Sequence, residues 1–294
     1  MDFFLQVFVT GLVVGSIYAL VALGFVLIYK ASDVINFAQG QLLLVGAYVS
    51  LTLAATYNVP FLLAVLCALV GSIVLGLAIE RFILRPFIGE PVIAVIMATI
   101  GLSSFLGGLI QVIWGTETRT FPQVFPTAPV HFGPAAVSQV YLWSLGLSIL
   151  LLVVFSAFFK YSSTGIVMRA TADDQTAALS MGISVKKVFG LTWAIAAVVA
   201  AIGGILLGNI NGVNSSLAQI GLKVLPVAIL GGLDSIPGAV LGGIIIGLLE
   251  NVVGGYLDPL VGGGVKEVIP FVVLVIVLMI RPYGLFGKEI IERV

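Results

Sequence analysis

The feature that most constrains this chain is an apolar stretch from Val34 to Ile79, which contains no Asp, Glu, Lys or Arg. A membrane-spanning helix needs about 20 consecutive apolar residues, so this stretch is long enough for two of them. Turn-forming residues at Tyr57, Asn58 and Pro60 divide it near the middle. We therefore expect two membrane helices here, in a chain whose solvent is largely lipid.

Composition extends this expectation to the whole chain. Charged residues make up 9% and hydrophobic residues 60% of the sequence, whereas an ordinary soluble domain has about 25% charged residues. The formal net charge is zero, which argues against the basic surface typical of nucleic-acid-binding proteins. The single cysteine, Cys67, excludes a disulfide within the chain. We expect contact with membrane lipid and none with nucleic acid.

The remaining apolar runs complete the predicted architecture. We predict an all-α, polytopic transmembrane bundle of about eight spans with broken or re-entrant segments, forming one permease-like domain over residues 1–294. Besides the two spans already named, the expected spans are about Leu5–Tyr29, Pro91–Ile113, Tyr141–Phe159, Val188–Ile210, an irregular region Val224–Glu250 and a short run Val268–Ile280.

Basic residues predict how the bundle is oriented. They gather in three regions: Arg81 and Arg85; then Lys160, Arg169, Lys186 and Lys187; then Arg281, Lys288 and Arg293. Loops rich in Lys and Arg face the cytoplasm, so we expect these three regions on the inner side. The loop from Trp114 to Gln139 should then face outside.

Two apolar regions are interrupted in a similar way. Asp33 precedes VINFAQG and Asp234 precedes SIPGA, and each is followed by an apolar run that contains glycine. Paired interrupted segments in the two halves of a transporter can mark its substrate path. The alternative is two ordinary polar loops, and the sequence does not separate the two.

No arrangement typical of an enzyme is present. The sequence lacks a GxxxxGK[ST] phosphate-binding loop, and its one histidine, His131, is distant from Cys67. Asp173 and Asp174 are adjacent and cannot share one helix face as a catalytic pair. We expect no metal site, no cofactor and no catalytic residue in this chain.

Polar residues inside apolar runs are candidates for a translocation path. A polar group facing lipid is costly, so these side chains should face other helices or a water-filled path. Bonding between neighbouring helices is the commoner of the two roles. Few ionisable residues lie within the spans, only Glu250 and Asp234 coming close, which argues against a proton- or sodium-driven carrier. The path candidates are Asn36, Gln39, Gln41, Thr99, Ser103 and Asn209.

The longest polar connection, residues 161–187, predicts a cytoplasmic loop that contains a short helix. Arg169 to Met181 is rich in helix formers, Thr171 is a possible cap and Gly182 a plausible stop. A helix held between two spans could transmit force from a cytoplasmic partner, although a solvated connecting helix would look the same.

Five stretches of the chain resemble the branched-chain amino acid ABC-transporter permeases, and their order and spacing extend over nearly the whole length. They are YALVALGFVLIYKASDVINFAQGQLLLVGAY (Tyr18–Tyr48), ERFILRPF (Glu80–Phe87), MRATADDQTAALSMGIS (Met168–Ser184), GGLDSIPGAVLGGIIIGLLE (Gly231–Glu250) and RPYGLFG (Arg281–Gly287).

The resemblance implies that the polar loop inserts a coupling helix into an ATPase subunit. Many such loops carry Glu-Ala-Ala, three further residues and Gly; here Thr replaces the Glu, and the usual apolar-Pro continuation is missing. The implied ATPase-coupling residues are Arg169, Thr171, Asp173, Asp174, Thr176, Ala177, Ala178 and Gly182.

The same resemblance implies a set of partners and a location. These are a second, homologous permease, two ATPase subunits that use ATP and Mg, and an extracytoplasmic substrate-binding protein, assembled at the bacterial cytoplasmic membrane. The expected substrates are branched-chain or other hydrophobic amino acids, with urea, short amides or aromatic acids as alternatives. A stand-alone secondary transporter or channel is the alternative from a different class.

Overall fold

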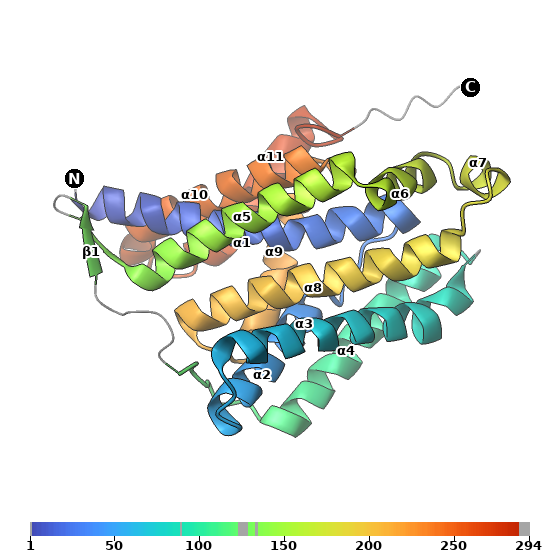
Figure 1. The fold of residues 1–294 in the computed structure, drawn as a ribbon. Helices are drawn as coiled ribbons and strands as arrows, with labels where there is room; N and C mark the ends of the chain where they lie inside the picture. Colours follow the sequence, from blue (N-terminus) through green and yellow to red (C-terminus); the bar gives the residue numbers. More distant parts are fainter. Residues whose placement is uncertain (1, 89, 123–128, 133–134, 288–294) are drawn as a thin grey trace.

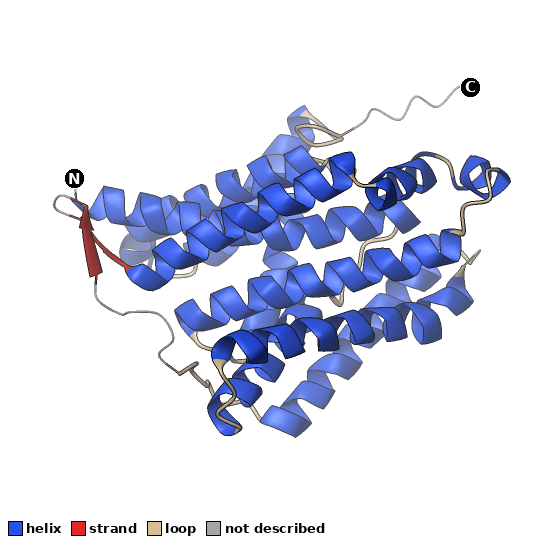
Figure 2. Ribbon diagram, in the orientation of Figure 1, coloured by secondary structure: helices blue, strands red, loops and turns tan. Residues whose placement is uncertain are grey.

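A computed structural model describes residues 2–88, 90–122, 129–132 and 135–287 of the chain. Helices account for nearly all of it, as Figure 2 shows. Six helices are long and apolar enough to cross a membrane, namely α1 (Asp2–Ser32), α3 (Phe61–Ile79) with its continuation to Phe87, α4 (Val92–Trp114), α5 (Gln139–Tyr161), α8 (Val185–Asn211) and α10 (Ile236–Val261). The prediction of a polytopic helical bundle is confirmed.

Shorter elements fill the rest of the bundle. Three apolar helices, α2 (Gln39–Leu51), α9 (Gln219–Gly231) and α11 (Val265–Ile280), lie among the long ones. Two short helices in the polar connection, α6 (Ser163–Asp173) and α7 (Gln175–Ser180), join α5 to α8. Short helical turns and one antiparallel hairpin complete the chain: η1 (Thr52–Thr56), η2 (Glu80–Leu84), η3 (Arg85–Phe87), η4 (Ser215–Ala218), β1 (Pro129–Phe132) and β2 (Ala135–Ser138).

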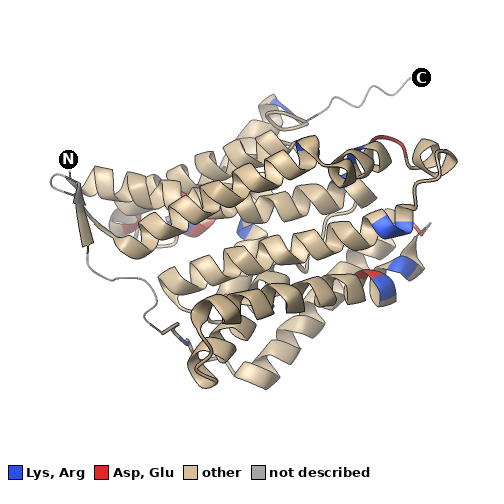
Figure 3. Cartoon of the chain, viewed as in Figure 1, with Lys and Arg blue, Asp and Glu red and all other residues tan. Residues whose placement is uncertain are grey.

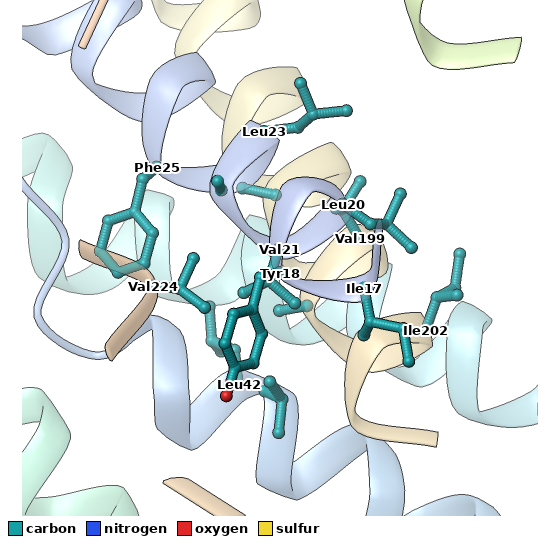
Figure 4. Packing of buried hydrophobic residues seen from close by; sticks show 14 of the residues in the cluster. Ile17, Tyr18, Leu20, Val21, Leu23, Phe25, Leu42, Val199, Ile202 and Val224 are labelled. Atoms are coloured by element: carbon teal, nitrogen blue, oxygen red, sulfur yellow. The ribbon is translucent and has the colours of Figure 1, made fainter. Parts of the chain in front are cut away.

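Helix α1 forms the centre of the bundle and packs against α5, α8, α9 and α10 (Figure 1). Along its most apolar stretch α1 is 94% buried, whereas α3, α4 and α5 are only 28%, 22% and 22% buried. In Figure 4 the α1 side chains Ile17 and Leu20 lie beside Ile202 and Val199 of α8, and Tyr18 of α1 lies beside Leu42 of α2. The apolar sides of α3, α4 and α5 are therefore left for lipid or for another subunit.

Small residues let α1 and α10 approach closely. A Cβ atom at Gly15 would lie 2.7 Å from the carbonyl oxygen of Gly243, well inside van der Waals contact. Close backbone approach through small residues is a usual means of packing helices in lipid, where no hydrophobic force drives them together.

Most basic residues lie at one end of the bundle, the right-hand end in Figure 3. This basic end comprises the last turn of α1, η2 and η3 after α3, the α6–α7 connection, the first turn of α8 and the segment 281–287. The three basic regions of the sequence thus share one side, as predicted, although Lys288 and Arg293 lie outside the described residues. The hairpin β1–β2 lies at the opposite end (Figure 1).

The chain breaks between α1 and α2 and again between α8 and α9. Residues 33–38 and 212–218 lead back into the bundle, and the short helices α2 and α9 then begin beside each other with Gly40 and Gly221 in backbone contact. Paired interrupted segments therefore exist, but the partner of the Asp33 segment is 212–218.

The predicted interruption of Val224–Glu250 near Asp234 is present, because α9 ends at Gly231 and α10 begins at Ile236. The part after the interruption, however, is a full-length span and not a broken helix. The Ser235 hydroxyl accepts a hydrogen bond from the Gly238 amide at 3.1 Å, and Pro237 occupies the first turn. Both are signals that start a helix. α10 then runs unbroken through Glu250 for 26 residues.

Candidate functional site

The first candidate site is a cluster of buried polar side chains, Asn36, Gln39 and Thr99, at the start of α2. The Asn36 amide donates to Gln39 Oε1 at 3.2 Å, and the Gln39 amide donates to the Ala196 carbonyl of α8 at 3.3 Å. The Phe37 amide donates to the Thr99 hydroxyl of α4 at 3.4 Å. Gly24 of α1 leaves the space that the Gln39 side chain fills.

This cluster supports the re-entrant segment. All three side chains are fully buried, and Asn36 Oδ1 also accepts from the Ala38 backbone amide at 3.0 Å. Non-helical backbone inside a membrane needs side-chain hydrogen-bond partners for its N–H and C=O groups, because no water is present to supply them. Of the two roles that the sequence left open, the geometry is that of hydrogen bonding between helices.

The other three path candidates are not joined to this cluster by any hydrogen bond among the described residues. Gln41 faces α4 beside Gly107, with its side-chain oxygen buried and unbonded in the described part of the chain. Asn209 donates to the Ile205 carbonyl of its own helix at 2.8 Å. Ser103 lies half-buried on α4.

The second candidate site is a polar cavity in the half of the bundle away from the basic end. We call it the charged cavity, since Lys223 of α9, Glu250 of α10, and Lys266 and Glu267 of α11 line it together with Tyr18 of α1. Its volume is about 270 Å³. Another part of its wall is lined by polar residues from the end of α8, the second interrupted segment and the start of α9, namely Asn211, Asn214, Ser216 and Gln219.

An ion-pair network crosses this cavity. Lys223 Nζ lies 3.3 Å from Glu250 Oε1 and 2.7 Å from Glu267 Oε2, and Lys266 Nζ donates to Asn251 Oδ1 at 3.3 Å. The Lys223 and Glu250 side chains are 11% and 1% exposed, whereas Glu267 is 61% exposed. The network thus runs from a buried carboxylate to a carboxylate at the edge of the bundle.

Sequence reasoning missed this network. Glu250 was noted as an ionisable residue near the spans, but its pairing with Lys223 was not predicted. Lys223 and Glu250 stand 27 positions apart, and only the return of α10 alongside α9 brings them together. The detectable signal was a lone Lys inside the apolar run that became α9.

The third candidate site is the α6–α7 connection within residues 161–187. Ser162 caps α6 by accepting from the Gly165 amide at 2.9 Å, and Asp174 caps α7 by accepting from the Thr176 and Ala177 amides at 2.8 and 2.9 Å. The single predicted helix is therefore two short ones, because the Asp174 side chain restarts the helix. Gly182, with φ of +82°, follows the end of α7 as predicted.

Thr171 is not a cap. It is fully buried inside α6 and donates to the Val167 carbonyl at 2.9 Å. Arg169 donates to the Lys160 carbonyl at the end of α5 at 3.1 Å. Both residues hold α6 in place.

The surface of this connection is formed by other residues. Asp173, Asp174, Thr176, Ala177 and Gly182 are exposed, while Ala178 is buried. Two apolar side chains that sequence reasoning did not select, Leu179 and Met181, are 59% and 83% exposed at the tip. Exposed apolar groups outside the spans are typical of a protein contact.

A hydrogen bond joins this connection to the centre of the bundle. The Gln175 amide at the start of α7 donates to the Ala31 carbonyl in the last turn of α1, at 3.2 Å. The last carbonyls of a helix have no partner within it, so Gln175 supplies one. α7 is thereby attached to the helix that leads directly into the re-entrant segment 33–38.

Among the described residues, no group of three or more His, Cys, Asp or Glu side chains is placed to hold a metal ion. The Glu80–Arg85 pair at the basic end is held by two hydrogen bonds of 3.1 and 2.7 Å. It ties the start of η2 to the start of η3, where the chain turns toward α4.

Known proteins resemble this chain over nearly its full length. The family model described as "Branched-chain amino acid transport system / permease component" matches residues 7–278. The chain belongs to this permease family. The high-affinity branched-chain amino acid permease LivH of Escherichia coli K12 is 32% identical, covering 99% of this chain and 98% of that protein. BraD of Pseudomonas aeruginosa is 33% identical over the same shares.

A relative outside the bacteria and a solved structure extend the comparison. A probable permease named LivH in Methanocaldococcus jannaschii is 30% identical, covering 95% of this chain and 91% of that protein. A chain of PsaBC from Streptococcus pneumoniae, solved with a Fab, matches with a TM-score of 0.54 and 17% identity over 96% of this chain and 93% of its own. That likeness concerns the fold alone.

Family membership confirms the central prediction from the sequence, a multi-pass membrane permease related to branched-chain amino acid transporters. It also disfavours the stand-alone carrier, in spite of the buried ion pair in the charged cavity. The three candidate sites therefore belong to a permease of this family.

Proposed function

We propose that the chain is the membrane-spanning subunit of an ATP-driven importer of branched-chain or other hydrophobic amino acids, in a bacterial cytoplasmic membrane. The observation that carries the proposal is the relationship to this permease family over nearly the whole chain. Residues 1–294 form one permease domain, and ATP and Mg are used by separate ATPase subunits.

In this proposal the basic end faces the cytoplasm, in accordance with the positive-inside rule. The α6–α7 connection in residues 161–187 then projects toward an ATPase subunit. Its exposed residues Asp173, Asp174, Thr176, Ala177 and Gly182 contribute to the contact, together with Leu179 and Met181. The remaining predicted residues position α6 and α7 from the side that faces the bundle; they are Arg169, Thr171 and Ala178.

A second, homologous permease and a substrate-binding protein complete the assembly. The largely uncovered sides of α3, α4 and α5 provide apolar surface for lipid and for the second permease. The binding protein docks on the side opposite the basic end, where the hairpin strands β1 and β2 lie. Selectivity among amino acids is then shared with that protein.

The coupling mechanism needs a bundle with two arrangements. One is favoured when the ATPase subunits hold ATP, and the other is favoured when they do not. A push on α7 reaches α1 through the Gln175–Ala31 hydrogen bond and the contacts of α6 with α1. α1 continues into the re-entrant segment, so movement at the basic end is transmitted toward the interior. The glycine contacts between α1 and α10 allow closely packed helices to slide.

Reconstitution tests this proposal. The purified chain alone should hydrolyse no ATP, whereas proteoliposomes with the second permease, the ATPase and the leucine-loaded binding protein should show leucine-stimulated hydrolysis and uptake. Replacing Leu179 and Met181 by Ser should reduce stimulated hydrolysis, while the swap Leu179→Met/Met181→Leu, which keeps the apolar surface, serves as the matched control. Gradient-driven leucine uptake by the chain alone would refute the proposal.

A further inference from the structure

We propose that the charged cavity binds the zwitterionic head group of an amino acid. Glu250 and Glu267 face its ammonium group, and Lys223 and Lys266 face its carboxylate. The inference rests on the proposed amino-acid transport and adds a location for the substrate within this chain. It places one binding position in the half of the bundle opposite the basic end.

Charge balance favours a zwitterion over a simple ion. The cavity holds two lysines and two glutamates, so its formal charges cancel. Adding a lone cation or anion would leave a net charge among helices surrounded by lipid, which is costly. A zwitterion adds one charge of each sign, so it can pair with both kinds of side chain without changing the total.

The hydrogen-bonding capacity of the buried carboxylate is not used up. Glu250 is fully buried, and its Oε2 has no hydrogen-bond partner among the described residues. Its other oxygen lies 3.3 Å from Lys223, which is closer to Glu267, and the Tyr18 hydroxyl also faces this carboxylate. A buried carboxylate normally accepts several hydrogen bonds, and an ammonium group carries three donors.

The walls of the cavity suit the rest of a hydrophobic amino acid. Val14, Leu207, Leu217 and Ile220 line it beside the charged groups. These apolar side chains can contact an aliphatic side chain while the head group meets the charges. The volume of about 270 Å³ greatly exceeds the roughly 10–15 Å³ that one water molecule needs.

A purely structural role for the ion pairs would require a different environment. A network that only fastened α9 to α10 and α11 would be expected to satisfy every buried oxygen and leave no space, because partial satisfaction is unfavourable. Here the charged groups border an open volume, and the amide-bearing Gln219 lies exposed on its wall.

Cysteine labelling tests the inference directly, because Cys67 is the only native cysteine of this chain. Gln219→Cys is introduced with Cys67→Ser, and the full complex is reconstituted in proteoliposomes. A membrane-impermeant, anionic methanethiosulfonate is added on the side opposite the basic end, and labelling of this chain is followed by its mass. Tyr57→Cys, which is exposed and does not line the cavity, is the control cysteine.

L-Leucine at about four times its dissociation constant should slow labelling of Gln219→Cys about five-fold, since occupied sites are protected. 4-Methylpentanoate lacks the ammonium group and isopentylamine lacks the carboxylate, so neither should protect at the same concentration. Glu250→Gln should abolish protection by leucine and keep the unprotected labelling rate. Glu117→Gln, an exposed carboxylate change outside the cavity wall, should leave protection intact.

Three results would overturn the inference: no labelling of Gln219→Cys, equal protection by all three compounds, or protection by leucine that persists in Glu250→Gln. Leucine-stimulated ATP hydrolysis is measured on the same proteoliposomes. Loss of that stimulation in the parent complex would instead refute the proposed function, so the two failures are distinguishable.

Discussion

Removal of the Lys223 charge provides the most quantitative test of the structure. In Lys223→Met the side chain keeps its length, but Glu250, 1% exposed, loses the ammonium group at 3.3 Å. Breaking a buried ion pair by removing one partner costs about 3–5 kcal/mol, because the other charge remains buried. The second pair adds little, since Glu267 is 61% exposed and a pair that accessible contributes under about 1 kcal/mol.

Equilibrium unfolding in mixed dodecylmaltoside and SDS micelles, followed by tryptophan fluorescence, measures this cost. We expect Lys223→Met to lower the free energy of unfolding by about 4 kcal/mol and Glu267→Gln by about 0.5 kcal/mol. The double variant Lys223→Met/Glu250→Leu should recover at least about 2 kcal/mol of the loss, because the two residues interact directly. The reasoning fails if Lys223→Met costs no more than Glu267→Gln, or if the double variant is less stable than the single one.

Three further predictions concern the interrupted segments and the α6–α7 connection. Gly40→Val should prevent stable folding, because a Cβ atom there would overlap the Ala218 carbonyl. Gly101→Val, with nothing near its Cβ position, should fold normally. Equal thermal stability of the two variants in detergent would contradict the contact between Gly40 and Ala218. Asp174→Ala should destabilise α7 by about 1 kcal/mol through loss of its cap, and Asp174→Asn should not. Hydrogen exchange of the Thr176 and Ala177 amides measures this effect, and unchanged exchange in Asp174→Ala would refute the prediction. Gln175→Leu should reduce leucine uptake per ATP hydrolysed by severalfold and leave the stability of the bundle unchanged, because it removes the hydrogen bond to Ala31. Unchanged uptake per ATP in reconstituted vesicles would show that this hydrogen bond does not transmit the coupling.

The sequence predicted the elements whose signal is local. Span positions follow from apolar length, and the turn at Asn58 and Pro60 was recognised from residue types that end helices; Asn58 indeed has φ of +52°. The grouping of basic residues at one end follows from the positive-inside rule. Nothing beyond a window of about 20 residues is needed for any of these.

Features that depend on distant partners were not predictable in this way. The Lys223–Glu250 pair requires knowledge that α9 and α10 lie side by side. The role of Asn36 and Gln39 depends on Ala196 and Thr99, which come from other helices. Asp-Ser-Ile-Pro was interpreted as a break, and a turn does separate α9 from α10 there. The full length of α10 was not predicted, although Ser235 and Pro237 match the start of a helix.

The buried position of α1 has a consequence for biogenesis. α1 leaves the ribosome well before α10, yet α10 is the helix that contacts it through Gly11 and Gly15. Until α10 arrives, the glycine-lined side of α1 must face lipid or a chaperone. Nascent chains that stop before α10 therefore lack their central packing partner, and quality-control proteases should degrade them.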